Sequence, residues 1–438
     1  MSRIFCKITI MCLCILLLSS CSYNGTSGPN TKSDDNNSLI VGDGNDKVKS
    51  SNSNKLLIWG YDPAWDRLKS EMKKKFPNLE VKFIEQNVDI TNDFLDKAAA
   101  GNVPDVVVLK AEYRSIGKIH YMDVFDDLLE PPYNAKEIMG KFSKTQLCFA
   151  LSPDGNKLNA IPMAQYPSVA YYRKDILEKY GFPGDPDELG KYMENPDNWL
   201  NMAKELKKHD HWIAQWLSEP SDIYLKNMGF YDNNFNYIRK GPEIERTLYA
   251  ARVMRQFELA SNIGVWEPSG QEAIRSGKLC MVYLGSWGEK KLEEWAPNSK
   301  GLWRVTKLPF GANAFDGFHV LGIPKDSKNK EAAWEFIKMV IDNENKVFKE
   351  AYDKKNDYLG GQYSERLYTE LRKKLPEVYF TPLELKFDGL WQTELQNYYG
   401  FNYEQLNDSE AVKFIESRFD ETFKRDLNIL ENYVKSQK

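Results

Sequence analysis

The sequence predicts an α/β protein of more than one lobe, with each sheet mostly parallel and flanked by helices. Its 438 residues are too many for one ordinary hydrophobic core. From Lys55 onward, short apolar runs alternate with amphipathic stretches, an order that builds parallel sheets covered by helices. With 42% hydrophobic and 28% charged residues, the composition is that of a folded globular chain.

The first alternation gives three strands and two helices. Apolar runs or alternating apolar residues predict strands at residues 56–59, 79–83 and 105–109. Apolar residues recurring every three to four positions predict helices over 68–76 and 94–99, the first ended by the proline that follows it. The resulting βαβαβ order predicts a parallel sheet.

The pattern recurs along the rest of the chain. A strand end is expected within 156–163, and residues 168–182 read as a strand running into a helix. Residues 279–287 form a further strand with a Gly-Ser turn after it, and 318–340 a strand, a turn and a helix. An amphipathic stripe predicts a long helix over 410–434.

The N-terminus has the pattern of a bacterial lipoprotein signal. Arg3 and Lys7 precede an apolar run, residues 8–18, that is shorter than the ~20 residues needed to span a bilayer. The run ends in Leu-Ser-Ser-Cys, with the cysteine at Cys21, and this resembles a lipobox. The resemblance implies cleavage before Cys21 and attachment of a lipid to its thiol. The alternative is an ordinary secreted protein or a short membrane anchor with an incidental cysteine.

We therefore expect a signal peptide over residues 1–20 and a lipidated cysteine with a flexible tether over 21–54. The tether is rich in Ser, Asn, Gly and Asp and cannot bury enough apolar surface to fold. Cys148 and Cys280 are then the two cysteines of the folded part, and their spacing predicts neither a disulfide scaffold nor a zinc site. They are expected to be buried small apolar residues, although a bridge between them stays open.

An ordered set of motifs resembles a known family. The motifs are "KLLIWGYDPAWDRLKSEMKKKFPNLEVKF", "AAAGNVPDVVVL", "DGNKLNAIPM", "AYYRKDILEKYGF", "RSGKLCMVYLGSW" and "GIPKDSKNKEAAWEFIKMV". Together they resemble the extracellular solute-binding proteins of ABC importers, in the maltose-binding-like family 1, from Lys55 to Lys438. The run from Ala98 is the most specific of them, since the family carries A-G-x-x-P-D-V at that place.

The resemblance implies a type II periplasmic-binding-protein-like fold with a hinge between two lobes. Lobe one is expected over residues 55–164 and 315–357, and lobe two over 165–314 and 358–438. A solute would bind in the cleft between the lobes, in keeping with the rule that open α/β sheets bind ligands beyond the carboxyl ends of their strands. Closure of the lobes over the ligand would then be a hinge motion.

Residues directly after the predicted strands and at the crossings are the candidates for ligand binding. Aromatic rings stack on the C–H face of a sugar and planar polar groups pair with its hydroxyls, so this mixture points to carbohydrate. Within the family resemblance, the candidates are Tyr61, Asp62, Trp65, Glu112, Tyr113, Gln165, Tyr166, Gln215, Trp216, Glu219, Trp287 and Trp391.

Several candidates have a purely structural alternative. Asp62 would equally cap the helix that follows it, and Glu112 would be an exposed helix charge. Tyr166 would support the backbone of the crossing, and Trp287 would be a core residue. Trp287 is the leading candidate, because it directly follows a strand and is flanked by glycines that suit an open loop.

Several classes of function do not fit the sequence. A formal net charge of −4 gives no basic field for nucleic acid. No metal, nucleotide or nucleophile motif is present, so neither a cofactor nor catalysis is expected. The prediction is a monomeric lipoprotein on the outer face of the cell membrane that delivers a sugar, expected to be an oligosaccharide, to ABC permease subunits. The alternatives are a secreted glycoside hydrolase, which needs two carboxylates at a set distance, and a surface sensor or adhesin on the same fold.

Overall fold

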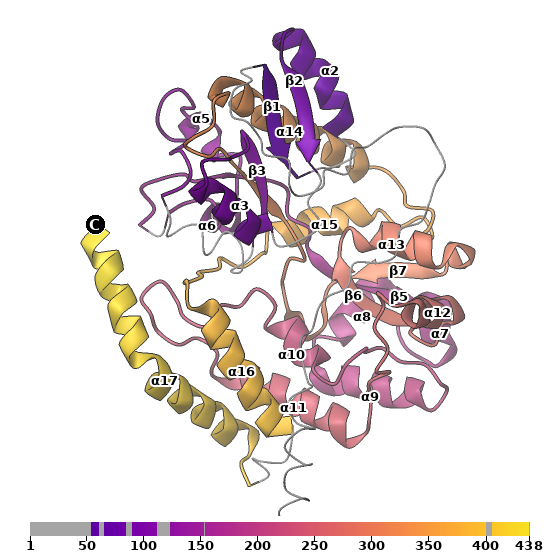
Figure 1. Ribbon diagram of the computed structural model, residues 1–438. Coiled ribbons are helices and arrows are strands. Elements are labelled where there is room, and N and C mark those ends of the chain that lie inside the picture. The colour runs from indigo at the N-terminus through magenta and orange to yellow at the C-terminus, as the bar shows by residue number, and fades with distance from the viewer. Residues whose placement is uncertain are drawn as a thin grey trace, which may run out of the picture. The chain divides into compact units, whose positions relative to one another are not determined.

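The computed structural model describes two β-sheets, each with its own helices (Figure 1). The described residues are 54–60, 65–84, 90–111, 123–152, 154–399 and 405–437. Elements keep the labels of Figure 1. The predicted lipidation site, Cys21, and the signal peptide and tether around it lie outside the described residues.

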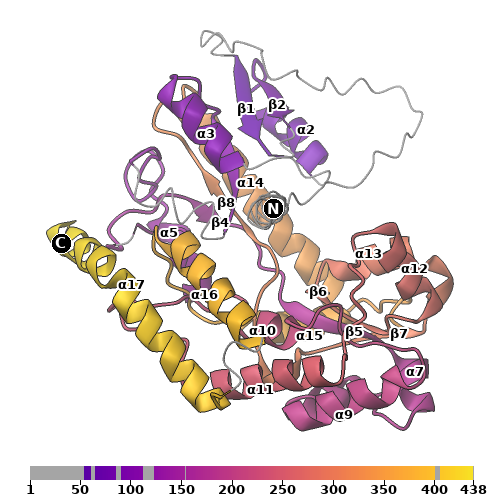
Figure 2. The same ribbon diagram turned by 60° about the horizontal axis from the view of Figure 1, so that its bottom comes forward.

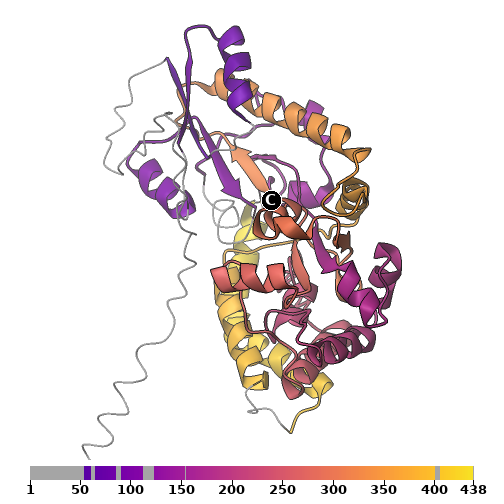
Figure 3. The same cartoon turned by 90° about the vertical axis from the view of Figure 1, so that its right-hand side faces the viewer.

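The first sheet has five strands in the order β2-β1-β3-β8-β4. They are β1 Lys55–Trp59, β2 Glu80–Ile84, β3 Val106–Lys110, β4 Ile161–Pro162 and β8 His319–Gly322. β1 is parallel to both β2 and β3, as the βαβαβ pattern predicted. β8 is antiparallel to β3 and to β4. Figure 3 shows the orange strand β8 beside the indigo strands.

The second sheet has three strands in the order β6-β5-β7, namely β5 Ser168–Arg173, β6 Met281–Gly285 and β7 Trp303–Thr306. β5 is antiparallel to both neighbours. The prediction of mostly parallel sheets is therefore wrong for this sheet and incomplete for the first, which is mixed. The sequence pattern of two strands predicts whether they pair in parallel only when a single crossover connects them. The strands of the second sheet are separated by several helices, and β8 follows the second sheet in the chain, so their directions could not be predicted.

Helices around the first sheet bury a stripe against it. α2 (Asp66–Lys75) buries Leu68 and Met72, four residues apart, and its three C-terminal lysines lie where the helix dipole favours cations. α3 (Ile90–Ala99) and the long α14 (Lys330–Tyr352) agree with the predicted helices. Two short helices, α5 (Lys136–Met139) and α6 (Lys144–Cys148), also pack in this part.

Helices around the second sheet begin at recognisable caps. α8 (Pro186–Tyr192) and α9 (Pro196–Lys207) each start with a proline after Asp185 or Asn195, whose side chains accept amide hydrogens of the first turn. The other helices are α7 Lys174–Lys179, α10 Glu219–Tyr224, α11 Pro242–Gln256, α12 Pro268–Ser276 and α13 Gly288–Trp295, with short 3-10 turns at Pro297–Ser299 and Pro309–Gly311.

The C-terminal part is helical. α15 (Ser364–Arg372) packs against α14, and α16 (Glu384–Tyr399) lies beside α17 (Asp408–Gln437), as Figures 1 and 2 show. α17 covers the predicted helix over 410–434 and contributes its apolar stripe to a cluster with α16 and α11. Residues 375–380, placed by the sequence with lobe two, contribute Leu375, Val378 and Phe380 to a cluster around the first sheet.

Two chain segments connect the sheets and pair with each other. The first runs from β4 to β5 and the second from β7 to β8. Pro167 and Phe315 form an antiparallel bridge, and Asp316 donates its amide hydrogen to the carbonyl oxygen of Tyr166 at 2.8 Å. Ser168, at the start of β5, donates to the carbonyl of Ala314 at 2.8 Å. The crossings are thus tied together at the edge of the second sheet.

Candidate functional site

Trp287 lies at the edge of the second sheet where β6 ends. Because β5 and β6 are antiparallel, the last residue of β6, Gly285, pairs with Ser168 at the start of β5, next to the crossing segments. The indole Nε1 of Trp287 donates to the carbonyl oxygen of Asp316 at 2.7 Å. The amide of Gly285 donates to a carboxylate oxygen of Asp316 at 3.2 Å. The half-buried ring of Trp287 is therefore held in one place.

Glycine is required at position 285. A Cβ there would lie 2.3 Å from the Nε1 of Trp287 and 2.7 Å from the carbonyl oxygen of Asp316. Neither neighbour can move without losing the hydrogen bond between them. The glycine in the motif "LGSWGE" thus lets the indole fold back over the strand end.

A buried network lies beneath this turn. The hydroxyl of Tyr171 is 3.1 Å from the carbonyl oxygen of Ser286 and 3.0 Å from the hydroxyl of Tyr368. Tyr368 in turn donates to the carboxylate of Glu289 at 3.1 Å. Burial raises the pKa of Glu289 and, more strongly, those of both tyrosines, so the phenols stay protonated. The network supports the backbone that carries Trp287.

The loop before α10 carries Trp216, which is 43% exposed. The carboxylate of Glu219 accepts the amide hydrogens of Gln215 at 2.9 Å and of Trp216 at 3.4 Å. Burial raises the pKa of Glu219 to about 7, although the hydrogen bond from the amide of Gln215 opposes the shift. Glu219 therefore holds the loop that presents Trp216.

Gln215 joins this loop to a second one. Its side-chain Oε1 accepts the amide hydrogen of Val265 at 3.0 Å, and its carbonyl oxygen accepts that of Asn262 at 2.8 Å. The indole of Trp216 lies against Gly264, where a Cβ would be 3.4 Å from its Cζ2. The two loops are thus fixed to each other through a buried amide side chain.

Trp266 on this second loop is 59% exposed and was not among the predicted site residues. Its ring centroid lies 5.8 Å from that of Trp287, with 31° between the planes, and 5.2 Å from the buried Trp295 in an edge-on contact. The sequence "IGVWEPSG" gives no sign of this position, because the exposure of an indole depends on tertiary packing.

Two polar side chains contact the segment that accepts the hydrogen bond of Trp287. Lys226, which follows α10, makes an ion pair of 3.1 Å with the carboxylate of Asp316, and both side chains are partly exposed. Asn227 accepts the amide hydrogen of Phe315 through its Oδ1 at 2.6 Å. The ammonium group of Lys226, the carboxylate of Asp316 and the indole of Trp287 therefore lie together on the segment from β7 to β8 and the end of β6. This combination suits the hydroxyl groups and the C–H face of a sugar.

The remaining predicted residues lie in different surroundings. Trp65 is 2% exposed and packs against Phe336 in the core of the first sheet, and Trp391 is buried in the cluster of α16 and α17, so we leave both out of the candidate site. Gln165 is buried in the first crossing, where its Nε2 has no hydrogen-bond partner among the described residues. Tyr166 supports the crossing through its backbone. Outside the described residues lie Tyr61, Asp62, Glu112 and Tyr113.

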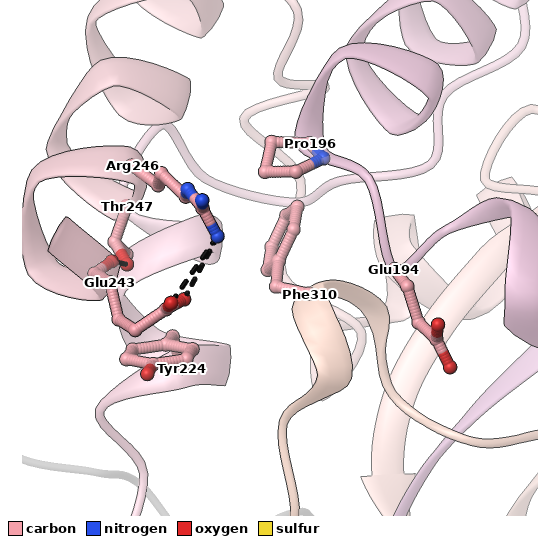
Figure 4. Close-up of a pocket in the computed structure, with 7 residues that line it drawn as sticks. All are labelled: Glu194, Pro196, Tyr224, Glu243, Arg246, Thr247 and Phe310. Carbon is pink, nitrogen blue, oxygen red and sulfur yellow. Dashed lines mark hydrogen bonds and ion pairs between the residues drawn. The ribbon is translucent and has the colours of Figure 1, made fainter.

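Two pockets lie away from Trp287 and are less suited to a sugar. One, of about 40 Å³, lies between Phe310 and the ion pair of Arg246 with Glu243 (Figure 4), and has room for little more than water. The other, of about 810 Å³, lies by the N-terminal half of α14, where Tyr133 and Trp334 are buried and offer little ring surface for stacking.

The part of the chain that the structure describes has no helix long and apolar enough to cross a membrane. Cys148 and Cys280 are free thiols, so the structure has no bridge between them. Cys280 is buried, as predicted, whereas Cys148 is half-buried; burial raises the pKa of both thiols, and that of Cys280 to about 12.

Comparison with solved structures identifies the fold. An extracellular solute-binding protein of family 1 is 18% identical over 84% of this chain and 99% of its own, with a TM-score of 0.68. The galacto-N-biose-/lacto-N-biose I-binding protein of an ABC transporter from Bifidobacterium longum is 14% identical over 84% and 97%, with a TM-score of 0.66. The sugar-binding protein MalE from Xanthomonas citri is 17% identical over 86% and 99%, with a TM-score of 0.64.

At these identities the likeness establishes the fold, which is the predicted α/β periplasmic-binding-protein fold, with a mixed and an antiparallel sheet in place of the mostly parallel sheets predicted. Membership of the family comes from the sequence itself. The family model described as bacterial extracellular solute-binding protein matches residues 68–348, well over half of the chain and including β3, β5, β6, β8 and Trp287. The chain therefore belongs to the bacterial extracellular solute-binding proteins.

Proposed function

We propose that this protein is the lipid-anchored solute-binding component of an ABC importer and that it captures a carbohydrate, an oligosaccharide, for delivery to the membrane permease. The observation that carries the proposal is the fixed indole of Trp287 at the end of β6, beside the ion pair of Lys226 and Asp316. A rigid aromatic ring next to paired polar groups is how proteins recognise sugars. Membership of a solute-binding family supports binding rather than catalysis.

Known relatives of the same fold support the carbohydrate class. The protein from Bifidobacterium longum is in complex with lacto-N-biose, and an ABC transporter-associated binding protein from B. animalis subsp. lactis is in complex with β-1,6-galactobiose. MalE3 of T. maritima has maltose bound. These ligands differ in linkage and composition, so they support a sugar without naming the one that this chain takes.

The proposed mechanism is a shift between open and closed forms. The first sheet with α14 would form one lobe and the second sheet the other, with lobe one over residues 55–164 and 315–357 and lobe two over 165–314 and 358–438. Tyr61, Asp62, Glu112 and Tyr113 would contribute from lobe one, and Trp287 from lobe two. A ligand that touches both lobes only when they close stabilises the closed form, which the permease would then recognise.

A thermal-shift screen over mono- and oligosaccharides tests the proposal. A ligand that binds only the folded state raises the melting temperature, so at least one sugar should do so in a concentration-dependent manner. The sugar that binds is then incubated with the protein and its products are analysed. Recovery of the unchanged sugar is expected, whereas turnover abolished by substituting a single Asp or Glu would favour a glycoside hydrolase.

Lipid anchoring is tested separately. The full chain expressed with its signal peptide should sediment with the membrane fraction, and Cys21→Ala should release it to the soluble extracytoplasmic fraction. Cys148→Ala serves as the control, since its thiol lies in the folded part of the chain. Retention of the Cys21→Ala protein in the membrane would remove the lipid anchor from the proposal and leave solute binding untouched.

A further inference from the structure

The first crossing is fixed on both sides of Gln165. On one side, the amide of Ala164 donates to a carboxylate oxygen of Glu344 on α14 at 3.0 Å. On the other side, the amide of Tyr166 donates to the carbonyl oxygen of Gly317, on the segment from β7 to β8, at 3.2 Å. Gln165 therefore lies between an anchor on α14 and an anchor on the second crossing. A rotation between two sheets is absorbed by a few backbone positions of this kind.

Two buried side-chain amides near this joint lack partners. Gln165 is 2% exposed, and its Nε2 donates to no acceptor within the described ranges of the chain. Asn343 on α14 is 8% exposed, and no donor of the same ranges reaches its Oδ1. A buried polar atom without a partner is costly, because it has given up its hydrogen bonds to water. One atom is a donor and the other an acceptor, so a single hydrogen bond would satisfy both.

The two amides flank a hydrogen bond that already exists. Gln165 follows Ala164 in the crossing, and Asn343 precedes Glu344 on α14. Ala164 and Glu344 are the residues joined at 3.0 Å. Asn343 also lies three residues after Val340, so it continues the helix face that is buried in the core of the first sheet. A change of backbone angles at Gln165 would therefore move its side chain relative to a fixed Asn343.

We propose that Gln165 and Asn343 form a hinge latch, a hydrogen bond from Nε2 of Gln165 to Oδ1 of Asn343 that is absent in this structure and forms when the lobes close over a ligand. This inference rests on the proposed function, because closure is the mechanism proposed there. The unpaired amides raise the free energy of the form described here, and their pairing removes that cost from the closed form. The latch thus favours closure without touching the ligand, and Gln165 is a positioning residue.

A double-mutant cycle tests the latch. Gln165→Met and Asn343→Leu each replace one amide by an apolar group of similar shape, and the double variant replaces both. Dissociation constants are measured by calorimetry with glucose and the maltose, cellobiose, xylobiose and β-1,6-galactobiose series up to tetrasaccharides. Each single variant should weaken the sugar that binds wild type by roughly 5- to 10-fold, the effect of one hydrogen bond. The double variant should bind no more weakly than either single one, because the same bond is lost in all three.

Melting temperatures without sugar provide the second measurement. None of the three variants should melt below wild type, since neither amide has a bond to lose in the form described here. Gln146→Met is the matched control, because Nε2 of Gln146 already donates to the carbonyl oxygen of Met163 in the same crossing at 3.0 Å. It should lower the melting temperature, and any effect that it has on binding should add to that of Asn343→Leu.

The outcomes separate the latch from other roles of these residues. Weaker binding for Gln165→Met alone would make Gln165 a ligand contact, and losses that multiply in the double variant would mean that the two amides act independently. Either result overturns the latch while the proposed function stands, as do unchanged dissociation constants in both single variants or a lower melting temperature of either one. If wild type binds no member of any series, the proposed function fails and this inference fails with it.

Discussion

The indole nitrogen of Trp287 donates a hydrogen bond of 2.7 Å to the carbonyl oxygen of Asp316. Trp287 follows strand β6, and Asp316 lies on the segment from β7 to β8 that returns to the first sheet. The carboxylate of Asp316 also accepts the amide hydrogen of Gly285 and pairs with Lys226. The ring proposed to stack on a sugar is therefore attached to the segment that runs from β7 to β8, between the two sheets.

Replacing Trp287 tests both the ring and its hydrogen bond. Trp287→Ala should weaken sugar binding by about 5- to 150-fold, because a stacked ring contributes ~1–3 kcal/mol. Trp287→Phe keeps a ring but cannot donate to Asp316, so an intermediate loss is expected. Calorimetry with the sugar found by the screen measures both. An unchanged dissociation constant for Trp287→Ala would remove Trp287 from the site.

Adjacent tyrosines of β5 provide a matched pair of variants. Tyr171 bonds the backbone under Trp287, whereas Tyr172 points to the opposite face and donates to the carbonyl oxygen of Gly184 at 2.8 Å. Tyr171→Phe and Tyr172→Phe should each lower the free energy of unfolding by about 1–2 kcal/mol, since each loses a buried hydrogen bond. Only Tyr171→Phe should also weaken sugar binding. Equal affinities for the two variants would show that the network does not position Trp287.

Gln215 is expected to be a positioning residue. Gln215→Met keeps the volume but leaves the buried amide of Val265 without an acceptor, so the free energy of unfolding should fall by about 1–3 kcal/mol. Tryptophan fluorescence of the folded protein should change as well, because the loops of Trp216 and Trp266 lose the side-chain hydrogen bond that joins them, while their backbone bond through the Gln215 carbonyl remains. Gln392→Met, at an exposed position of α16, is the control and should change neither quantity.

Glu219 makes stability depend on pH. Its folded pKa of about 7 lies above the ordinary value, so the folded state binds more protons than the unfolded state between about pH 4.5 and pH 7. The free energy of unfolding, compared with that of a protein with a neutral side chain at position 219, should therefore fall as pH rises through this window and level off above pH 7. The cost of ionising the buried carboxylate should reach about 3 kcal/mol.

Glu219→Gln removes this titration while keeping an oxygen that can accept the loop amides. Urea denaturation of both proteins at pH 5, 6, 7 and 8 measures the effect. The free energy of unfolding of the variant, relative to that of wild type, should rise by about 2–3 kcal/mol between pH 5 and pH 8. A constant difference across the series would mean that Glu219 does not titrate in this range. Glu384, whose pKa burial also raises to about 7, is present in both proteins and cancels in the comparison.

Local patterns predicted the elements well and their partners less well. Leu68 and Met72 at helical spacing gave α2, and the apolar run before Lys110 gave β3. The antiparallel entry of β8 between β3 and β4 could not be seen, because it depends on where the chain returns after building another sheet. The pattern of apolar residues indicates which residues are buried and whether they form a helix or a strand. The direction in which two strands pair depends instead on the long stretch of chain that connects them.

The site divides in the same way. Trp287 was predictable, since it follows a strand and stands between glycines. Gln215 and Glu219 were predicted as ligand contacts; in the structure, Oε1 of Gln215 and one carboxylate oxygen of Glu219 accept backbone amide hydrogens, which the sequence did not indicate. Trp266 was not predicted, because its position beside Trp287 and Trp295 depends on tertiary packing. The sequence shows that a residue follows a strand. It does not show which side chains pack behind that residue in the folded protein.

The position of β8 also affects the order in which the chain can fold. β3 pairs with β1 on one side, and its other side pairs with a strand that begins only at His319, after the second sheet in the sequence. Until β8 is in place, β3 is an edge with free backbone groups, and such edges promote aggregation of incompletely folded chains. A fragment ending before residue 319 should therefore aggregate, and β8 should complete the sheet in a late, non-local step.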